Sequence, residues 1–173
     1  NQDGVRGRAN IVYSLVEKKM MLGRFGWKAA QPSLLEQNAG AFVGDIGITS
    51  WIHPDEECTY VQLDCIANKT KDDVTEDILN KVTIYTQTLA VPVRRNLNDS
   101  AALNGKKIFS QISCTSCHIP QFQTGNSSNI EMLNNQTIYP YSDFLLHDMG
   151  DELADDKDAY QFEGLATARE FRT

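Results

Sequence analysis

The feature that most constrains this chain is a pair of cysteines separated by two residues and followed at once by a histidine. These residues are Cys114, Cys117 and His118. The Cys-x-x-Cys-His spacing is typical of c-type haem attachment, in which the two thiols add to the vinyl groups of the porphyrin. The adjacent imidazole then lies under the iron as its proximal ligand. The sequence therefore predicts one covalently attached haem c, bound by these three side chains.

Two other kinds of site use closely spaced cysteines, and the motif alone leaves both open. A thioredoxin-like dithiol needs a strand before the motif and a helix after it. Here the preceding segment reads as a helix that Asp99 or Ser100 can cap, and Pro120 stops any helix that follows. A structural zinc site needs two further ligands, which could come from Cys58, Cys65 or His147.

The composition excludes several classes of partner. The 173 residues are 41% hydrophobic and 23% charged, which is ordinary for a globular protein of one or two small domains. No run of about 18 apolar residues occurs, so we expect no membrane span. The 16 basic residues against 23 acidic ones give a net charge of -7. Nucleic acids and anionic membranes both require a basic surface, so we expect neither as a partner.

The two ends carry no targeting or terminating pattern. The chain begins at Asn1 without a methionine, and no basic or apolar segment of a signal peptide follows. It ends as abruptly at Thr173. We therefore expect a part of a longer protein, with any export signal removed or lying outside this sequence.

Local patterns predict an α-rich chain with irregular stretches. Residues 9–25 fit two short strands joined at the charged residues 17–19, although a buried irregular segment fits equally well. A capping-box pattern predicts a helix from Ser33 to about Phe42. The clearest helix covers residues 75–90, and residues 121–135 read as a polar surface loop. Apolar residues recur along one face of that helix, at Ile78, Val82, Tyr85 and Leu89.

The segment from Asp99 to Phe122 resembles the amino-terminal helix and haem turn of cytochrome c domains. Gly105 and Phe109 lie four residues apart and therefore on one face of this helix. In the domains that it resembles, the small residue permits a close helix crossing and the aromatic residue packs near the haem. The resemblance implies a mainly α fold, namely a cytochrome c-like haem domain with additional helices, short strands and long loops.

Longer strings, spread over nearly the whole chain, resemble the di-haem oxidoreductases. These peroxidase-like proteins are sometimes labelled thiol oxidoreductases and are distantly similar to bacterial di-haem cytochrome c peroxidases. The strings lie at residues 23–29, 35–37, 45–49, 85, 89–92, 114–120, 139–143, 145–150 and 153–155. Only one haem-attachment motif is present here, so the resemblance implies a second haem in the full-length protein.

The resemblance also implies a function and a division of the chain. In the resembling enzymes one haem receives and stores electrons, and the other, with an open iron position, meets peroxide. This chain would hold the electron-transfer haem, with a redox protein or small electron donor as partner and peroxide as candidate substrate. Residues 1–97 would form a partial helical and irregular segment at the inter-haem interface. Residues 98–173 would form the haem-binding domain, truncated at its carboxy terminus.

Three side chains are candidates for the sixth iron ligand. Met149 would supply a thioether, which raises the reduction potential and suits a haem at which electrons enter. His147 would instead give a bis-imidazole site of lower potential, and Met132 is a third candidate. Each has a plain structural alternative: His147 and Asp148 could form a hydrogen-bonded pair, and Met149 could fill the core. A ligand beyond Thr173 is a further option.

Two more residues take candidate roles from the resemblance. Di-haem peroxidases place an aromatic side chain between their haems, and Trp27, in a glycine-rich string, is the candidate for that electron relay. An ordinary buried tryptophan fits the string equally well. Asp45 stands where the peroxidases carry a distal acid, which can move a proton between the peroxide oxygens.

The remaining cysteines, Cys58 and Cys65, are separated by six residues. We interpret them as a disulfide that closes a small loop, because their spacing lacks the tight geometry of redox dithiols; a redox-active pair is the alternative. A disulfide fits an oxidising compartment, and haem c is attached outside the bacterial cytoplasm, so we expect a periplasmic or otherwise exported protein.

Three functions remain open at this point. The first is the c-type haem-binding portion of a periplasmic di-haem oxidoreductase. The second is a stand-alone mono-haem electron-transfer domain without catalysis. The third is a haem-free interaction domain stabilised by zinc or by a disulfide. Whether this chain is itself an enzyme is left undecided by its sequence.

Overall fold

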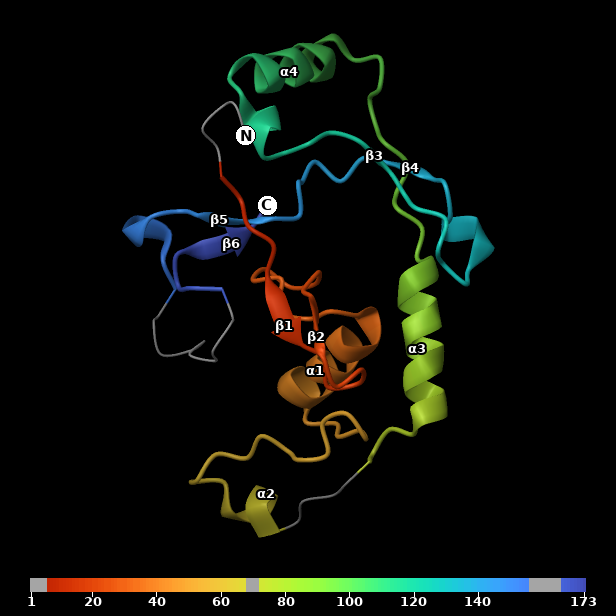
Figure 1. Cartoon of the computed structure of the whole chain (residues 1–173), viewed down its shortest axis with the longest axis vertical. Coiled ribbons are helices and arrows are strands. Elements are labelled where there is room, and N and C mark those ends of the chain that lie inside the picture. Colours follow the sequence, from red (N-terminus) through yellow and green to blue (C-terminus); the bar gives the residue numbers. More distant parts are fainter. Residues whose placement is uncertain (1–5, 68–71, 156–165) are drawn as a thin grey trace.

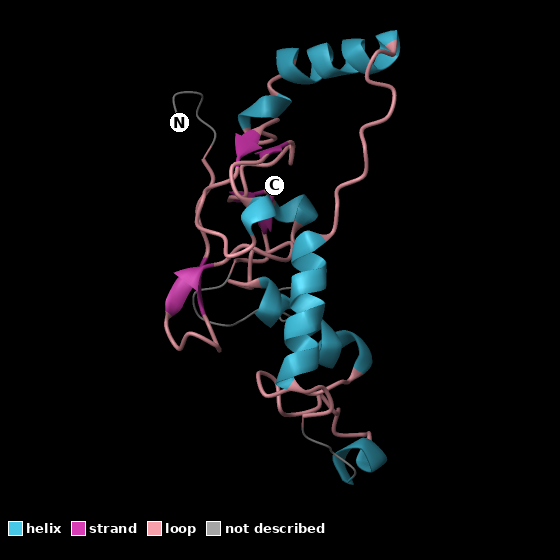
Figure 2. Cartoon of the chain, turned by 90° about the vertical axis from the view of Figure 1, so that its right-hand side faces the viewer, coloured by secondary structure: helices cyan, strands magenta, loops and turns pink. Residues whose placement is uncertain are grey.

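The computed structural model describes residues 6–67, 72–155 and 166–173. The helices in these ranges are α1 (Leu34–Ile46), α2 (Leu63–Ala67), α3 (Glu76–Thr88) and α4 (Ser100–Gln111). Three short 3-10 helices cover Cys114–Ser116, Glu131–Leu133 and Asp151–Leu153. In the views of Figures 1 and 2, α4 and α2 lie at opposite ends of the long axis, and α3 runs along it. No described helix has both the length and the apolar character needed to span a membrane.

The strands pair into three small antiparallel sheets. β1 (Ile11–Tyr13) pairs with β2 (Met20–Leu22), and β3 (Phe122–Gln123) pairs with β4 (Thr137–Ile138). β5 (Leu146–Asp148) pairs with β6 (Glu170–Arg172), which places His147 opposite Phe171. Each sheet has two strands, so none provides a face wide enough to organise the whole chain.

The prediction of a mainly α, cytochrome c-like fold is wrong. The described chain is a mixed structure of low regular content, and Figure 2 shows long stretches of loop between the helices. After the Cys114 turn, no described segment forms an α-helix. Polar side chains there bond to the backbone instead: the Thr124 hydroxyl donates to the Leu133 carbonyl at 2.7 Å, and the Asn134 amide donates to the Ser128 carbonyl at 2.9 Å. Such bonds compete with helix formation.

The predicted helix starts are confirmed by their caps. Ser33 accepts a hydrogen bond from the Glu36 amide, Thr75 from the Ile78 amide and Asp99 from the Ala102 amide. α1 continues four residues beyond the expected end and stops at Gly47, whose φ of 69° favours glycine.

The predicted hairpin at residues 9–25 is also confirmed, and a buried carboxylate fixes it to α1. The Ser14 hydroxyl donates to Glu36 Oε1 at 2.6 Å, and the Leu15 amide donates to Glu36 Oε2 at 2.9 Å. Glu36 is only 2% exposed. Burial of a carboxylate is tolerated because these donors replace water, so the hairpin and the helix form one packed unit.

The face that α3 buries differs from the predicted apolar stripe. Leu79 and Thr83 are buried, whereas Ile78, Tyr85 and Leu89 are exposed. Leu79 packs with Ala39 of α1 and with Ile52, and the Asn38 amide of α1 donates to the hydroxyls of two α3 threonines, Thr83 and Thr86. The packing of Leu79 and the hydrogen bonds from Asn38 together fix the orientation of α3, which leaves most of the predicted apolar stripe exposed.

The beginning and the end of the chain are bound to each other. The backbones of Arg8 and Leu146 exchange two hydrogen bonds of 2.9 Å, and the Arg172 amide donates to the Trp27 carbonyl at 2.7 Å. Arg8 also forms a two-pronged ion pair with Glu170, with nitrogen to oxygen distances of 2.5 and 2.7 Å. These contacts join the two parts into which the sequence was predicted to divide, residues 1–97 and 98–173. That division stays a prediction.

The Arg8 and Glu170 pair gives a pH-dependent prediction. The hydrogen bond from Arg8 holds the pKa of Glu170 at about 2, below its usual 4.5. A lowered folded-state pKa contributes stability that is full above pH 4.5 and is lost as the pH falls toward 2. We expect Arg8→Gln to lower the free energy of unfolding at pH 7 by about 1 kcal/mol, since Arg8 is partly exposed.

The measurement is urea denaturation of both proteins between pH 7 and pH 2, followed by circular dichroism. The difference between them is expected to shrink below pH 4.5 and to vanish near pH 2. Arg6→Gln, at an exposed arginine two residues away, serves as the control. A difference that stays constant over this pH range would contradict the role of Glu170.

Candidate functional site

The Cys-x-x-Cys-His motif forms one tight turn after α4. Ser113 adopts a φ of 66°, which reverses the chain, and the 3-10 helix Cys114–Ser116 follows. The amides of Cys117 and His118 both donate to the Cys114 carbonyl, at 3.4 and 2.9 Å. Neither motif cysteine forms a disulfide with a described residue, and both are half-buried. The turn therefore presents two thiols and an imidazole from five consecutive residues.

The His118 ring is oriented by a backbone carbonyl. Its Nδ1 lies 2.9 Å from the carbonyl oxygen of Tyr141. With the hydrogen on Nδ1, the ring donates to that carbonyl and leaves the lone pair of Nε2 available to a metal. Phe109 of α4 packs beside this ring, with centroids 5.8 Å apart, and lies 6.0 Å from the Tyr141 ring. Phe109 thus supports the motif from α4.

The motif lines a cavity of about 530 Å³. Cofactor pockets commonly measure roughly 300–1,000 Å³ and are mostly apolar. The lining includes Cys114, Cys117 and His118 from the motif, together with His147, Met149, Leu153 and Phe171 from the last part of the chain. Two thiols, one imidazole with an available nitrogen, a thioether and an apolar wall are the side chains that a covalently attached haem requires. The donor set therefore fits a c-type haem.

His147 is held in the wall of this cavity by Asp143. Its Nε2 lies 2.8 Å from Asp143 Oδ2, and its Nδ1 lies 4.0 Å from Cys117 Sγ. His147 is 9% exposed. The partner is Asp143 rather than Asp148, which instead pairs with Arg169 at 2.9 Å. Because Asp143 occupies Nε2, the arrangement favours His147 as a positioned neighbour of the cysteine over a role as iron ligand.

The two candidate methionine ligands lie in different surroundings. Met149 follows β5, is 48% exposed and lines the cavity together with the motif. Its amide donates to the Arg169 carbonyl at 2.8 Å, which fixes the backbone at this point. Met132 lies in the turn Glu131–Leu133, is 69% exposed and is not among the cavity residues. The structure therefore brings Met149, and not Met132, to the cavity of His118.

Trp27 and Asp45 lie outside this cavity. Trp27 is 81% exposed, so it is not an ordinary core tryptophan, and its carbonyl joins it to the cavity residue Arg172. Asp45 lies exposed in the last turn of α1. Their roles as electron relay and distal acid stay predictions.

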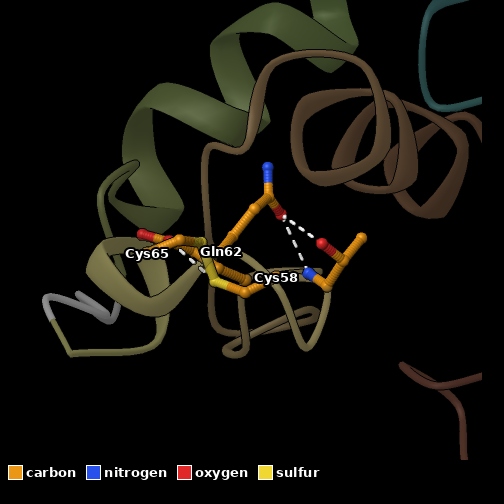
Figure 3. Close-up of a disulfide and its surroundings, with 5 residues drawn as sticks. Cys58, Gln62 and Cys65 are labelled. Carbon is orange, nitrogen blue, oxygen red and sulfur yellow. Dashed lines mark hydrogen bonds between the residues drawn. A yellow bond between two sulfur atoms is a disulfide. The ribbon is translucent and has the colours of Figure 1, made fainter.

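The predicted disulfide between Cys58 and Cys65 is confirmed, with Cα atoms 5.8 Å apart. Figure 3 shows this bridge beside Gln62, whose side-chain oxygen accepts hydrogen bonds from the Thr59 amide and hydroxyl at 2.9 and 3.2 Å. The bridge ties α2 to the loop before it. Neither bridged cysteine lines the cavity. Because their sulfur atoms are bonded to each other, neither can serve as a thiolate ligand in a zinc site with the motif.

Sequence reasoning missed three residues of the site. Asp143 positions His147, the Tyr141 carbonyl positions His118, and Gly7 packs against the His147 ring, where an added Cβ would lie 2.8 Å from Nε2. The four-residue spacing of Asp143 and His147 was a usable pattern. The Tyr141 contact could not be predicted from the sequence, because a backbone carbonyl is present at every residue. The Gly7 contact could not be predicted either, because it joins residues 140 positions apart in the chain.

A family model described as "Di-haem oxidoreductase, putative peroxidase" matches residues 1–173, the whole chain. Searches of curated proteins and of solved structures gave no match.

Proposed function

Because the chain belongs to the di-haem oxidoreductase family, we propose that it forms a portion of such an enzyme that binds one c-type haem through Cys114, Cys117 and His118. The observation that carries this proposal is the convergence of these three side chains on one largely apolar cavity. A haem bound there would supply an iron centre that accepts and releases single electrons.

The residues of the chain have separate tasks at this centre. The thiols of Cys114 and Cys117 would hold the porphyrin on the motif turn through thioether bonds. His118 would ligate the iron through Nε2, in the orientation that the Tyr141 carbonyl sets. Leu153 and Phe171 of the cavity wall would cover part of the porphyrin, which would lower the local dielectric and thereby contribute to the reduction potential.

We assign Met149 as the sixth ligand, since it is the thioether at the cavity, whereas His147 is engaged by Asp143. Met149→Ala is expected to abolish the near-infrared band of methionine-ligated ferric haem. The same change should lower the reduction potential by on the order of 0.1 V, a fraction of the range that axial ligands span. Absorption spectroscopy and redox titration of the purified variant measure both effects. Met132→Ala is the matched control, and survival of the band in Met149→Ala would exclude this assignment.

The wider proposal concerns the direction of electron flow. Electrons enter at this haem from a redox protein or small donor, and the net charge of -7 favours a basic partner. Trp27, exposed and joined through its carbonyl to a cavity residue, would be the residue that relays them toward a second haem. Asp45, exposed in the last turn of α1, would hold the proton that a peroxide substrate requires. The disulfide and the thioether chemistry both support a periplasmic location.

The test of the central proposal is expression of this chain in a bacterial periplasm that contains the cytochrome c maturation machinery. The expected product is a red protein whose mass exceeds that of the polypeptide by one haem. Its pyridine haemochrome spectrum should be that of a haem with two thioether bonds. Colourless protein of unmodified mass, folded by circular dichroism, would contradict the proposal.

A further inference from the structure

A second cavity lies behind the wall of the first. It measures about 430 Å³ and is bounded by the turn after β2 and by residues 143–145. Its apolar lining comes from Leu22, Phe25, Phe144 and Leu145. Among the described residues, Arg172 is the one that lines both cavities; the other lining residues differ.

Two arginines line this second cavity, Arg24 and Arg172. Neither forms an ion pair with a residue that the structure describes. Arg172 donates one hydrogen bond to the Arg24 carbonyl, and Arg24 is exposed at the rim. Guanidinium groups are well suited to bind carboxylates through two parallel hydrogen bonds. An apolar space with arginines at its edge fits a ligand with an apolar body and a carboxylate edge.

The acidic residue among the described lining residues, Asp143, forms no ion pair with these arginines. Asp143 Oδ2 faces His147 at 2.8 Å, and its Oδ1 accepts hydrogen bonds from the Leu145 amide and the Thr173 hydroxyl, at 2.9 and 2.8 Å. Both oxygens of this carboxylate are therefore engaged inside the wall. The cavity keeps an excess of positive charge for an incoming anion.

The two cavities share their wall. Arg172 lines both of them, and Asp143 at the second cavity contacts His147 at the first. The Arg172 amide also donates a hydrogen bond to the Trp27 carbonyl. Trp27 is therefore bound through its backbone to a residue of this shared wall. A group held in the second cavity would thus lie one side chain away from a haem on Cys114 and Cys117.

We infer that the second cavity binds the propionate edge of the family's other haem, with Arg24 at its carboxylates. This inference rests on the proposed function, because it assumes two haems, while the chain itself holds a single attachment motif. The porphyrin carries the two properties that the cavity requires, an apolar ring and a pair of carboxylates on one edge. The shared wall then sets the short path between the two haems.

The experiment uses the full chain with its covalent haem in place, so that the first cavity is filled. Metal-free protoporphyrin IX is titrated into it, and porphyrin fluorescence, which the neighbouring haem quenches, reports binding. Arg24→Gln keeps the carbonyl that Arg172 uses and is expected to weaken binding about tenfold, as loss of a charge-assisted hydrogen bond does. Arg24→Lys should restore most of the affinity.

Two controls separate this site from unspecific adsorption. Arg95→Gln, at an exposed arginine outside both cavities, should leave the affinity unchanged. Protoporphyrin dimethyl ester, which lacks the charged carboxylates, should bind wild type weakly and be insensitive to Arg24→Gln.

Equal affinity of wild type and Arg24→Gln for protoporphyrin IX overturns the inference, and so does absence of quenched binding. Either result leaves the proposed function standing, since covalent attachment at Cys114 and Cys117 is read from the haem spectrum of the same samples. Loss of that spectrum in wild type would instead remove the proposed function and this inference with it.

Discussion

Replacing both Cys114 and Cys117 by serine is expected to reduce covalent haem to the background level of a haem-stained gel. Serine keeps the size of the side chain but cannot form the thioether bonds, so the porphyrin can be extracted by acid and acetone. His118 stays in place in this variant, and its ring remains bound to the Tyr141 carbonyl. The pyridine haemochrome spectrum and the intact mass of the purified variant measure the loss.

The single substitutions and a cysteine control sharpen this result. Each single variant should retain at most one thioether bond, which shifts the haemochrome band to the red of the wild-type position. Cys58→Ser combined with Cys65→Ser removes the other cysteine pair, which lies outside the cavity, and should leave the haem attached. If that control lost its haem as completely as the motif variant, haem loss would reflect misfolding and not the attachment chemistry.

Lys28→Met is expected to lower the free energy of unfolding by about 3 kcal/mol, because it removes a buried ammonium and leaves a partly buried carboxylate and three carbonyls without their donor. The Lys28 ammonium is 8% exposed and lies 2.7 Å from Asp155 Oδ2. It also donates to three carbonyls, those of Thr167, Ala168 and Glu170, at 3.3, 3.1 and 2.8 Å. Methionine keeps the length of the side chain but supplies no donor.

The destabilisation should also reach the cavity that the Cys-x-x-Cys-His motif lines. The same ammonium lies 3.5 Å from the centroid of Phe171, which lines that cavity opposite His147 on the β5 and β6 pair. Urea denaturation should show the loss of stability, and the melting temperature should fall by about 6–12 °C. Lys19→Met is the control: its ion pair with Glu17 is exposed, so a change within about 0.5 kcal/mol is expected. Equal effects at both lysines would contradict the role of Lys28.

The comparison of sequence and structure separates two kinds of information. Helix starts at Ser33, Thr75 and Asp99 were predictable, because a cap depends on residues three positions apart. The hairpin of residues 9–25 and the bridge between Cys58 and Cys65 were predictable because they too join residues that are close in the sequence. The fold class was not, because helix content depends on how the polar loops after Cys117 satisfy their backbone groups.

By itself, the sequence determined which residues are predicted to attach a haem, since the spacing of two thiols and an imidazole within five residues is a local property. Only the tertiary structure decided what surrounds that motif. Selection of Met149 over Met132 and engagement of His147 by Asp143 depend on the β5 and β6 pair and on the contact of Arg8 with Leu146. The physical reason is that each of these contacts joins residues far apart in the chain, so its register follows from burial and hydrogen bonding across the whole fold and not from any neighbouring residues.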